Sequence, residues 1–352
     1  MGVNLETMVF SWEMRASVKD VAFAVRGFVR RGNRHAADWF GIRRGTSLAA
    51  AILLCAVAGS LAGCSQPDTH AQSETPPPLS YLGSWGVKGD GPGQLDQPTC
   101  IATDTIGNVY LADTGSHFVG KFDSRGTALL SYQDEKLKQP QSIAVDAGGA
   151  IYVTDASRQS AFVYLPNGDR YRQIRLRIRP NSKDQLGVAV DDDGLIHILD
   201  ADAGRIFAYT PRFRLVRTWQ PAAKEPGGKA RVQAVATNSD GNLYLADPAG
   251  NRILRFTYEG RFVAAIGGAA DGVDRKLSSQ FAVSGNYVFV MDANGRTLHV
   301  WSTDGRPKLD LDLAPELGQG NRPAPALAVS PRKELFVLDA PGTRVLRYRI
   351  NF

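Results

Sequence analysis

The chain has 352 residues, of which 43% are hydrophobic and 22% charged, enough for one large or two ordinary globular domains. Its formal net charge is +6, but residues 1–63 contain eight Lys or Arg against four Asp or Glu, which leaves 33 basic and 31 acidic residues from Cys64 onward. Because the excess of positive charge lies mostly in this leading segment, the composition excludes a uniformly basic domain, and we expect no nucleic-acid partner.

Residues 1–63 have the pattern of a targeting segment. Arg43 and Arg44 precede the uncharged run LAAAILLCAVAGSL at 48–61, which is short for a membrane-spanning helix and suits a signal sequence. The run ends in Leu61-Ala62-Gly63-Cys64, which resembles a bacterial lipobox. The resemblance implies a lipoprotein with two or three acyl chains on Cys64, which anchor a protein stably. The alternative is an ordinary signal peptide with an incidental cysteine.

Residues 64–79 follow as the lipidated cysteine and a tether. The sequence SQPDTHAQSETPPPL at 65–79 is polar and proline-rich, which is typical of a flexible linker. Ser65 stands where some Gram-negative lipoproteins have an aspartate that retains them in the inner membrane. We therefore expect an envelope protein on the outer membrane, facing the periplasm, if the cell is Gram-negative. Cys100 is the one cysteine left beyond the anchor, and we expect a buried thiol without a disulfide.

From residue 80 onward one unit repeats six times. Each copy contains a short apolar run ending in aspartate, such as NVYLAD, and an aromatic residue follows nine positions later. The six aspartates are Asp113, Asp155, Asp200, Asp247, Asp292 and Asp339, spaced by 42, 45, 47, 45 and 47 residues. Turn residues separate the apolar runs in each copy, so each unit is predicted to be a four-stranded antiparallel meander.

Six such meanders predict an all-β fold, a six-bladed β-propeller of four-stranded antiparallel blades over residues 80–352. The stretch DGNLYLADPAGNRILRFTYEG at 240–260 resembles the NHL-repeat family, which implies the same fold. The last unit lacks a fourth strand, and YLGSWG at 81–86 supplies one, with Trp85 matching Trp219. We therefore expect the N-terminal strand to complete the last blade and close the ring.

The repeated aspartates are expected to be structural. Asp113, Ser116 and His117 have the side chains of a nucleophilic triad, but only the aspartate recurs in the other units. Residues so close together on one turn cannot easily align as nucleophile, base and orienting group. An Asx-type turn, in which the carboxylate accepts backbone N–H bonds between strands two and three, explains six equivalent aspartates better.

Catalytic and metal-binding residues are harder to find, and we assign none. His117, His197 and His299 occupy different positions in their repeats, so they are not expected to converge on one ion. The resemblance also implies an alternative, because peptidyl-hydroxyglycine lyase is a six-bladed propeller of this family that uses zinc and calcium. No matching constellation of residues is present, so we expect no cofactor, with Ca or Zn only under that enzyme alternative.

Recognition is the function that the pattern favours. The long connections between units, at 86–97, 132–139, 179–186, 220–231, 267–278 and 312–324, differ in length and composition. Variable loops on a rigid ring form a natural binding surface, so we expect a binding or scaffolding propeller with a peptide, glycan or protein partner. Candidate residues on this face are His117, Arg205, Arg252 and Arg344, although a salt bridge or hydrogen bond that holds neighbouring turns is the favoured role of these arginines.

One further stretch, RYRQIRLRIRP at 170–180, alternates arginines with apolar residues. This spacing predicts the outer strand of the second blade, with Arg175, Arg177 and Arg179 on its exposed face. Two interpretations stay open. The arginines discourage edge pairing, or they bind the phosphate groups of anionic lipid or lipopolysaccharide.

Overall fold

The computed structural model describes residues 77–352, apart from Asp90, Pro92, Arg177, Gly342 and the segments 179–184, 222–229, 269–274 and 319–322. The expectations for the targeting segment, for Cys64 and for the tether up to residue 76 lie outside the described residues.

The described strands form six four-stranded antiparallel sheets, which we number as blades in chain order. Blade one has β2 (Pro98–Thr103), β3 (Val109–Asp113), β4 (Phe118–Phe122) and β5 (Ala128–Gln133), and blade two has β6 (Pro140–Val145), β7 (Ile151–Asp155), β8 (Ser160–Tyr164) and β9 (Arg170–Arg175). Blade three has β10 (Leu186–Val190), β11 (Ile196–Asp200), β12 (Arg205–Tyr209) and β13 (Leu215–Trp219). Blade four has β14 (Ala234–Thr237), β15 (Leu243–Asp247), β16 (Arg252–Phe256) and β17 (Phe262–Gly267). Blade five has β18 (Leu277–Ser284), β19 (Tyr287–Asp292), β20 (Thr297–Ser302) and β21 (Pro307–Asp312). Blade six has β22 (Ala326–Ser330), β23 (Glu334–Asp339), β24 (Arg344–Ile350) and the N-terminal β1 (Leu79–Trp85).

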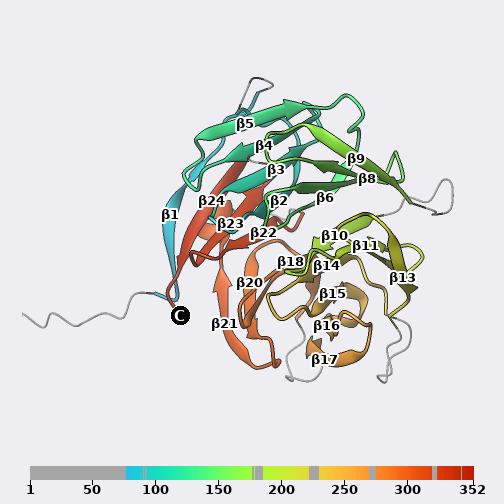
Figure 1. Cartoon of the computed structure of the whole chain (residues 1–352). Helices are drawn as coiled ribbons and strands as arrows, with labels where there is room; N and C mark the ends of the chain where they lie inside the picture. The colour runs from blue at the N-terminus through green and yellow to red at the C-terminus, as the bar shows by residue number, and fades with distance from the viewer. Residues whose placement is uncertain are drawn as a thin grey trace, which may run out of the picture. The chain divides into compact units, whose positions relative to one another are not determined.

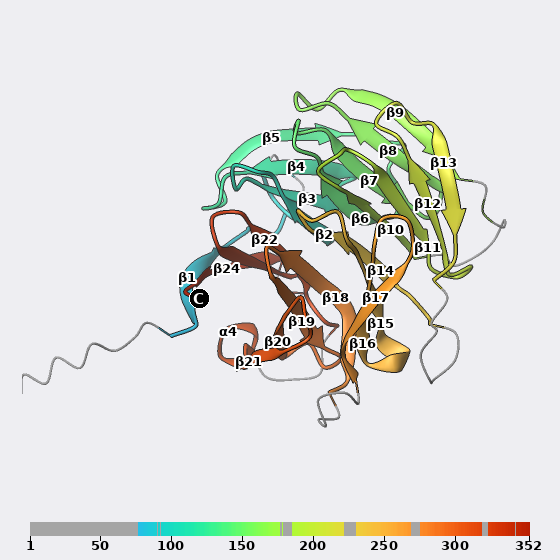
Figure 2. The same cartoon turned by 60° about the horizontal axis from the view of Figure 1, so that its bottom comes forward.

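The sheets are arranged in a ring, as Figures 1 and 2 show. The first strand of each blade is innermost, and these strands contact one another in the order β2, β6, β10, β14, β18, β22 and back to β2. This is the arrangement of a six-bladed β-propeller. Two short helical segments, η2 (Pro248–Gly250) and α4 (Ala314–Leu317), interrupt the all-β pattern.

The alternating strand direction gives the ring two different faces. The connections between blades and the turns between second and third strands lie at one end, which we call the connection face. The turns between first and second strands and between third and fourth strands lie at the other end, which we call the turn face. Every statement below about where a residue lies uses these two names.

Strand β1 is the outermost strand of blade six (Figure 1). It pairs with β24 from Leu79 opposite Ile350 to Trp85 opposite Val345, with a bulge between Tyr81 and Gly83. The Asn351 side chain donates a hydrogen bond of 2.7 Å to the Pro77 carbonyl oxygen. The described chain therefore begins at the turn face, where the other blades have the turn between strands three and four.

Aromatic side chains fill the space between neighbouring blades. The aromatic residues predicted nine positions after each aspartate are all buried: Phe122, Tyr164, Tyr209, Phe256, Trp301 and Tyr348. Three outer strands add a second ring over the next blade, in the pairs Trp85–Phe122, Tyr132–Tyr164 and Trp219–Phe256, with ring centroids 5.0, 5.4 and 5.4 Å apart. These contacts stabilise the ring because offset aromatic pairs bury large apolar areas.

The boundary between blades two and three is built differently. Ile174 has the register position of Tyr132 and Trp219, so the outer strand supplies no ring there. The ring comes instead from Phe213, on the turn between β12 and β13, which packs against the cluster containing Ile174 and Leu176.

The predicted outer strand of blade two is shorter in the structure. β9 ends at Arg175, whereas the sequence pattern predicts a strand over 170–180. Arg175 pairs with Ser160, the first residue of β8, and beyond it the Leu176 N–H donates one more bond, of 2.9 Å, to the Gln159 carbonyl oxygen. Arg175 is exposed and Ile174 and Leu176 are buried, as the alternation predicts, while Arg177 and Arg179 lie outside the described residues.

Candidate ligand-binding site

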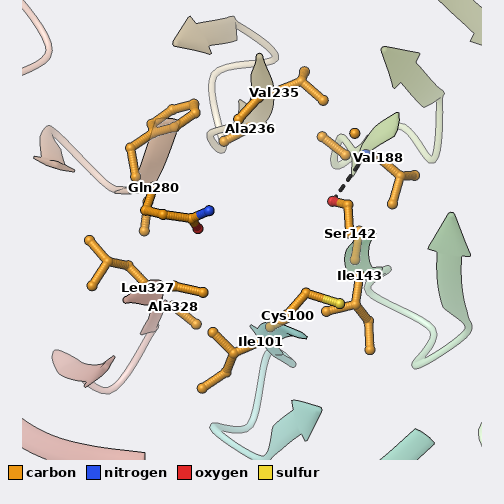
Figure 3. A pocket seen from close by; sticks show the side chains of 18 of the residues that line it. Cys100, Ile101, Ser142, Ile143, Val188, Val235, Ala236, Gln280, Leu327 and Ala328 are labelled. Atoms are coloured by element: carbon orange, nitrogen blue, oxygen red, sulfur yellow. Dashed lines mark hydrogen bonds between the residues drawn. The ribbon is translucent and has the colours of Figure 1, made fainter. Parts of the chain in front are cut away.

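The axis of the ring contains a cavity of about 470 Å³. It is lined by residues on or directly beside the six innermost strands, β2, β6, β10, β14, β18 and β22 (Figure 3). Its volume lies in the range of ordinary small-molecule sites, roughly 300–1,000 Å³.

Many polar side chains of this lining join one blade to the next. The Thr99 hydroxyl donates to the Pro140 carbonyl oxygen at 2.9 Å, and the Thr237 hydroxyl donates to the Val190 carbonyl oxygen at 2.9 Å. The Ser142 hydroxyl oxygen accepts from the Val188 N–H at 3.2 Å, the bond drawn in Figure 3. These groups satisfy backbone atoms of the neighbouring blade, so they are committed to closing the ring.

Three carboxamides of the lining are different. Gln185 and Gln233 come directly before β10 and β14, and Gln280 precedes Phe281 in β18, so all three lie toward the connection face. None of their side chains forms a hydrogen bond with another described residue, and Gln280 points into the cavity in Figure 3. By contrast, the Gln141 side-chain oxygen accepts from the Leu186 N–H at 2.7 Å. Blades three, four and five therefore present free amide groups to the cavity.

Among the described residues that line the cavity, none has a charged side chain. The one ionisable group is the Cys100 thiol, and burial raises its pKa to about 12, so it is neutral at ordinary pH. The cavity is thus an uncharged site with amide donors and acceptors among apolar walls, in which Ile101, Val188 and Leu327 take part.

The cavity is continuous with a hollow at each face. A hollow of about 400 Å³ at the connection face shares Thr99, Gln280 and Ala326 with it, and four prolines line this opening. A hollow of about 620 Å³ at the turn face shares Thr103, Thr237 and other residues. A ligand can therefore approach the free carboxamides from the side of the variable connections.

The repeated aspartates lie at the ends of the second strands, on the connection face, and not in the axial cavity. The Asp113 carboxylate is fully buried and accepts four backbone N–H bonds, from Asp96, Gln97, Gly115 and Ser116, at 2.8–3.1 Å. It therefore fastens the incoming connection as well as the turn. Asp155 and Asp247 likewise accept bonds from both segments, while Asp200 and Asp292 accept N–H bonds from their own turn. Asp339 is paired with an arginine.

The candidate residues of the connection face are partly occupied. Arg252 pairs with Asp247, and Arg344 with Asp339, each at 3.0 Å, and Arg344 also donates to the Glu316 carbonyl oxygen at 2.8 Å. Arg205 lies over the Phe207 ring. His117, which the sequence suggests to be a solvent-facing turn residue, is half-buried with φ 55°, and its Nδ1 is buried without a hydrogen-bond partner.

The other two histidines have structural partners. His197 Nε2 lies 3.1 Å from Asp191 Oδ2, and His299 Nδ1 lies 2.8 Å from Asp310 Oδ1. His197 replaces the tyrosine of other blades, where the Tyr110 and Tyr152 hydroxyls donate to Asp104 and Asp146. Sequence reasoning missed this pairing, although its signal is present as a constant six-residue spacing between the turn acid and the ring.

Over the described ranges, no group of three or more His, Cys, Asp or Glu side chains is placed to hold a metal ion. In the same part of the chain, no helix has the length and apolar character needed to cross a membrane.

Comparisons with known proteins support the fold. No family model matches the sequence, and no curated protein matches it either. Among solved structures, a streptogramin B lyase is 16% identical with a TM-score of 0.53, covering 77% of this chain and 86% of its own. A virginiamycin B lyase from Staphylococcus aureus is 12% identical with a TM-score of 0.53, covering 77% and 98%. The β-propeller domain of Cps50 (Swd1) from Myceliophteria thermophila is 12% identical with a TM-score of 0.54, covering 78% and 100%. At these identities the likeness establishes a β-propeller and nothing narrower.

Proposed function

We propose that this protein is a lipid-anchored, extracytoplasmic propeller of the NHL type that binds a peptide, glycan or protein partner at its connection face. The NHL-like stretch at 240–260 and the lipobox-like residues ending at Cys64 support the class and the location. The described chain begins at the turn face, which leaves the connection face free for a partner.

The observation on which the binding role rests is the set of free carboxamides at the mouth of the axial cavity. Gln185, Gln233 and Gln280 each offer donors and an acceptor that no described residue satisfies. A buried ligand group that satisfies them gains hydrogen bonds, whereas a charged group finds no counter-charge among the described lining residues and loses its hydration. The part of the partner that enters the cavity is therefore an uncharged group rich in hydroxyls or amides.

Calorimetric titration of the full chain with uncharged probes tests this proposal. We choose N,N′-diacetylchitobiose and a tetra-alanine peptide blocked at both ends. The double variant Gln233→Leu/Gln280→Leu should weaken binding of whichever probe binds by at least tenfold, because a lost buried hydrogen bond costs about 1–3 kcal/mol. Gln133→Leu, on the exposed outer strand β5, is the matched control and should bind as the parent does. Equal affinity of parent and double variant, or no binding of either probe, overturns the cavity as the binding site.

An enzymatic alternative has a distinct outcome. Two of the structures with similar folds are lyases, and the sequence resemblance implies a metal-dependent lyase or hydrolase at the mouth of the ring. Stoichiometric zinc or calcium in the purified full chain would favour that alternative. A binding propeller as proposed here needs neither ion for the probe titrations, which should give the same affinity after treatment with EDTA.

A further inference from the structure

The turn between the third and fourth strands of blade three departs from its equivalents. The five described turns share one hydrogen-bond pattern, with the N–H of the fourth residue donating to the carbonyl of the first. They are Asp123–Thr127, Leu165–Asp169, Thr210–Arg214, Thr257–Arg261 and Ser302–Arg306. Their side-chain charges sum to zero in blades one, four and five and to −1 in blade two. Blade three alone among them has +2, from Arg212 and Arg214.

The same turn has an unusual backbone. Its fourth residue is Phe213 with φ 62°, where the other four turns have glycine at φ 82–91°. A bulky residue in the left-handed region costs energy and is retained only where its surroundings hold it. Here the ring packs 5.8 Å from that of Tyr171 and 5.0 Å from the Arg172 guanidinium. The turn is thereby fixed against β9, and Arg212 and Arg214 flank Phe213 in the sequence.

These residues form a basic and aromatic surface, which we define as the blade-three patch: Tyr171, Arg172, Arg212, Phe213 and Arg214. All three arginines are exposed, and none forms an ion pair with another described residue. Tyr171 is 57% exposed, and beside the patch Leu215 and Val216 are 48% and 49% exposed.

Acidic residues border the patch, but none of those described forms an ion pair with it. Asp192 and Asp193 precede Gly194, which lies beside Pro211 of the patch turn, and Asp169 directly precedes β9. Arg170, on the same strand as Arg172, is by contrast held by Asp134 at 3.0 Å. The three patch arginines are therefore exposed and have no ion-pair partner among the described residues.

The position of the patch relative to the chain start is the second observation. The turn at 210–214 lies on the turn face, and Pro77 lies on that face too, where it stands in for the equivalent turn of blade six. Arg175, by contrast, is at the opposite end of β9, pairing with Ser160 beside the connection face. A lipid anchor at Cys64, as proposed above, would join the propeller at this face.

We propose that the blade-three patch binds the phosphate groups of an anionic phospholipid bilayer. Guanidinium groups bind phosphate oxygens in a bidentate manner, and aromatic rings with exposed aliphatic neighbours suit the interface between headgroups and acyl chains. Contact of the patch holds the turn face toward the bilayer and directs the connection face away from it. This inference rests on the lipid anchor proposed above and is independent of the ligand in the axial cavity.

Hydrogen exchange of the full chain, reconstituted in vesicles, measures the contact locally. We compare vesicles of phosphatidylcholine with vesicles that also contain about 30% phosphatidylglycerol. Each basic residue near such an anionic surface contributes roughly 1 kcal/mol to binding. Peptides covering 170–173 and 210–216 should exchange more slowly only on the anionic vesicles. The protection should vanish at about 1 M NaCl, where the Debye length is ~3 Å. The protection should be lost in the triple variant Arg172→Ala/Arg212→Ala/Arg214→Ala, because removing three arginines lowers the equilibrium constant for contact with the anionic bilayer about 100-fold.

The matched control removes three arginines from equivalent turns that also contain an acid. Arg125→Ala/Arg261→Ala/Arg306→Ala takes away the same charge and should keep the protection. Equal protection on neutral and anionic vesicles, or its loss in both triple variants, refutes the proposal. Protection removed by millimolar inorganic phosphate alone would also refute it, because that result indicates a free-anion site rather than a bilayer contact. Melting curves of the parent and both variants identify any loss of folding.

Discussion

Removing the carboxylate of Asp113 should destabilise the propeller far more than removing that of Asp292. Asp113 is fully buried and accepts four backbone N–H bonds, which join the 96–97 segment to the 115–116 turn. Asp292 is half-buried and accepts two, from Arg296 and Thr297. The two aspartates occupy equivalent places in blades one and five, so each is a control for the other.

The magnitude follows from the number of donors left without an acceptor. Hydrogen bonds to a charged group are worth about 1.5–3 kcal/mol each, but they are not additive, and water can reach the partly exposed Asp96 and Gln97 amides. We expect Asp113→Ala to lower the free energy of unfolding by about 3–5 kcal/mol and Asp292→Ala by about 1–2 kcal/mol. Asp113→Asn should fall between parent and Asp113→Ala, because its oxygen can still accept the bonds made at Oδ1 while its NH₂ faces the Asp96 N–H.

Urea unfolding of the full chain measures these differences as shifts of the midpoint at unchanged slope. Probe titrations run beside it should show the parent's affinity in folded Asp113→Ala, since the carboxylate lies outside the cavity lining. If Asp113→Ala unfolds within about 1 kcal/mol of the parent, or no earlier than Asp292→Ala, the fastening role is refuted. If Asp113→Ala instead lost probe binding but kept the parent's stability, the Asp113 carboxylate would have a direct functional role rather than a structural one.

Three more outcomes are expected. Deleting residues 77–85 removes buried Leu79 and the Trp85–Phe122 contact, and each large apolar side chain lost lowers the free energy of unfolding by about 1.5–3 kcal/mol. The deletion also exposes the edge of β24, so size-exclusion chromatography should show aggregates. A monomer would show that β1 is not needed to close the ring. Burial raises the pKa of the Cys100 thiol to about 12, so the thiol stays protonated up to strongly alkaline pH. Iodoacetamide at about pH 8 should therefore label Cys100 only after unfolding, which peptide mapping measures. Labelling of the native thiol would contradict this burial. Cys64→Ala should abolish incorporation of radiolabelled palmitate and move the protein out of the membrane fraction, whereas retained label would place the acyl group elsewhere.

The sequence predicts the ring because the determinants of a blade are local. A second strand, a turn and a third strand span fewer than twenty residues, so the aspartates and the aromatic residues after them recur at a period that can be counted. Contacts between blades are not local. The bond from the Leu186 N–H to Gln141 crosses 45 positions, and nothing in either segment marks it. The free carboxamides of Gln185, Gln233 and Gln280 can be recognised only once the structure shows which other polar side chains form hydrogen bonds between blades.

The blade-three turn shows a different limit. Residues 210–214 read TPRFR, without the glycine that marks the other described turns, so turn chemistry gives no sign of a left-handed residue at Phe213. The reason lies in another blade. Ile174 leaves out the large ring that Tyr132 and Trp219 supply elsewhere, and the Phe213 side chain fills that space from the turn. The exchange of an aromatic residue between strand and turn is visible only in three dimensions.

Repetition separates structural groups from functional ones in this fold. A ring of six similar blades makes the same demands six times, and residues that meet those demands recur, as the aspartates and the aromatic residues after them do. Gln185, Gln233 and Gln280 are free although Gln141 at a neighbouring position is bonded, and Arg212 and Arg214 lie where other described turns balance their charge. Both departures lie on blades two to five, and they point to opposite faces. A partner at the connection face and a bilayer at the turn face can therefore be engaged at the same time, and a patch variant should leave the affinity for a cavity probe unchanged.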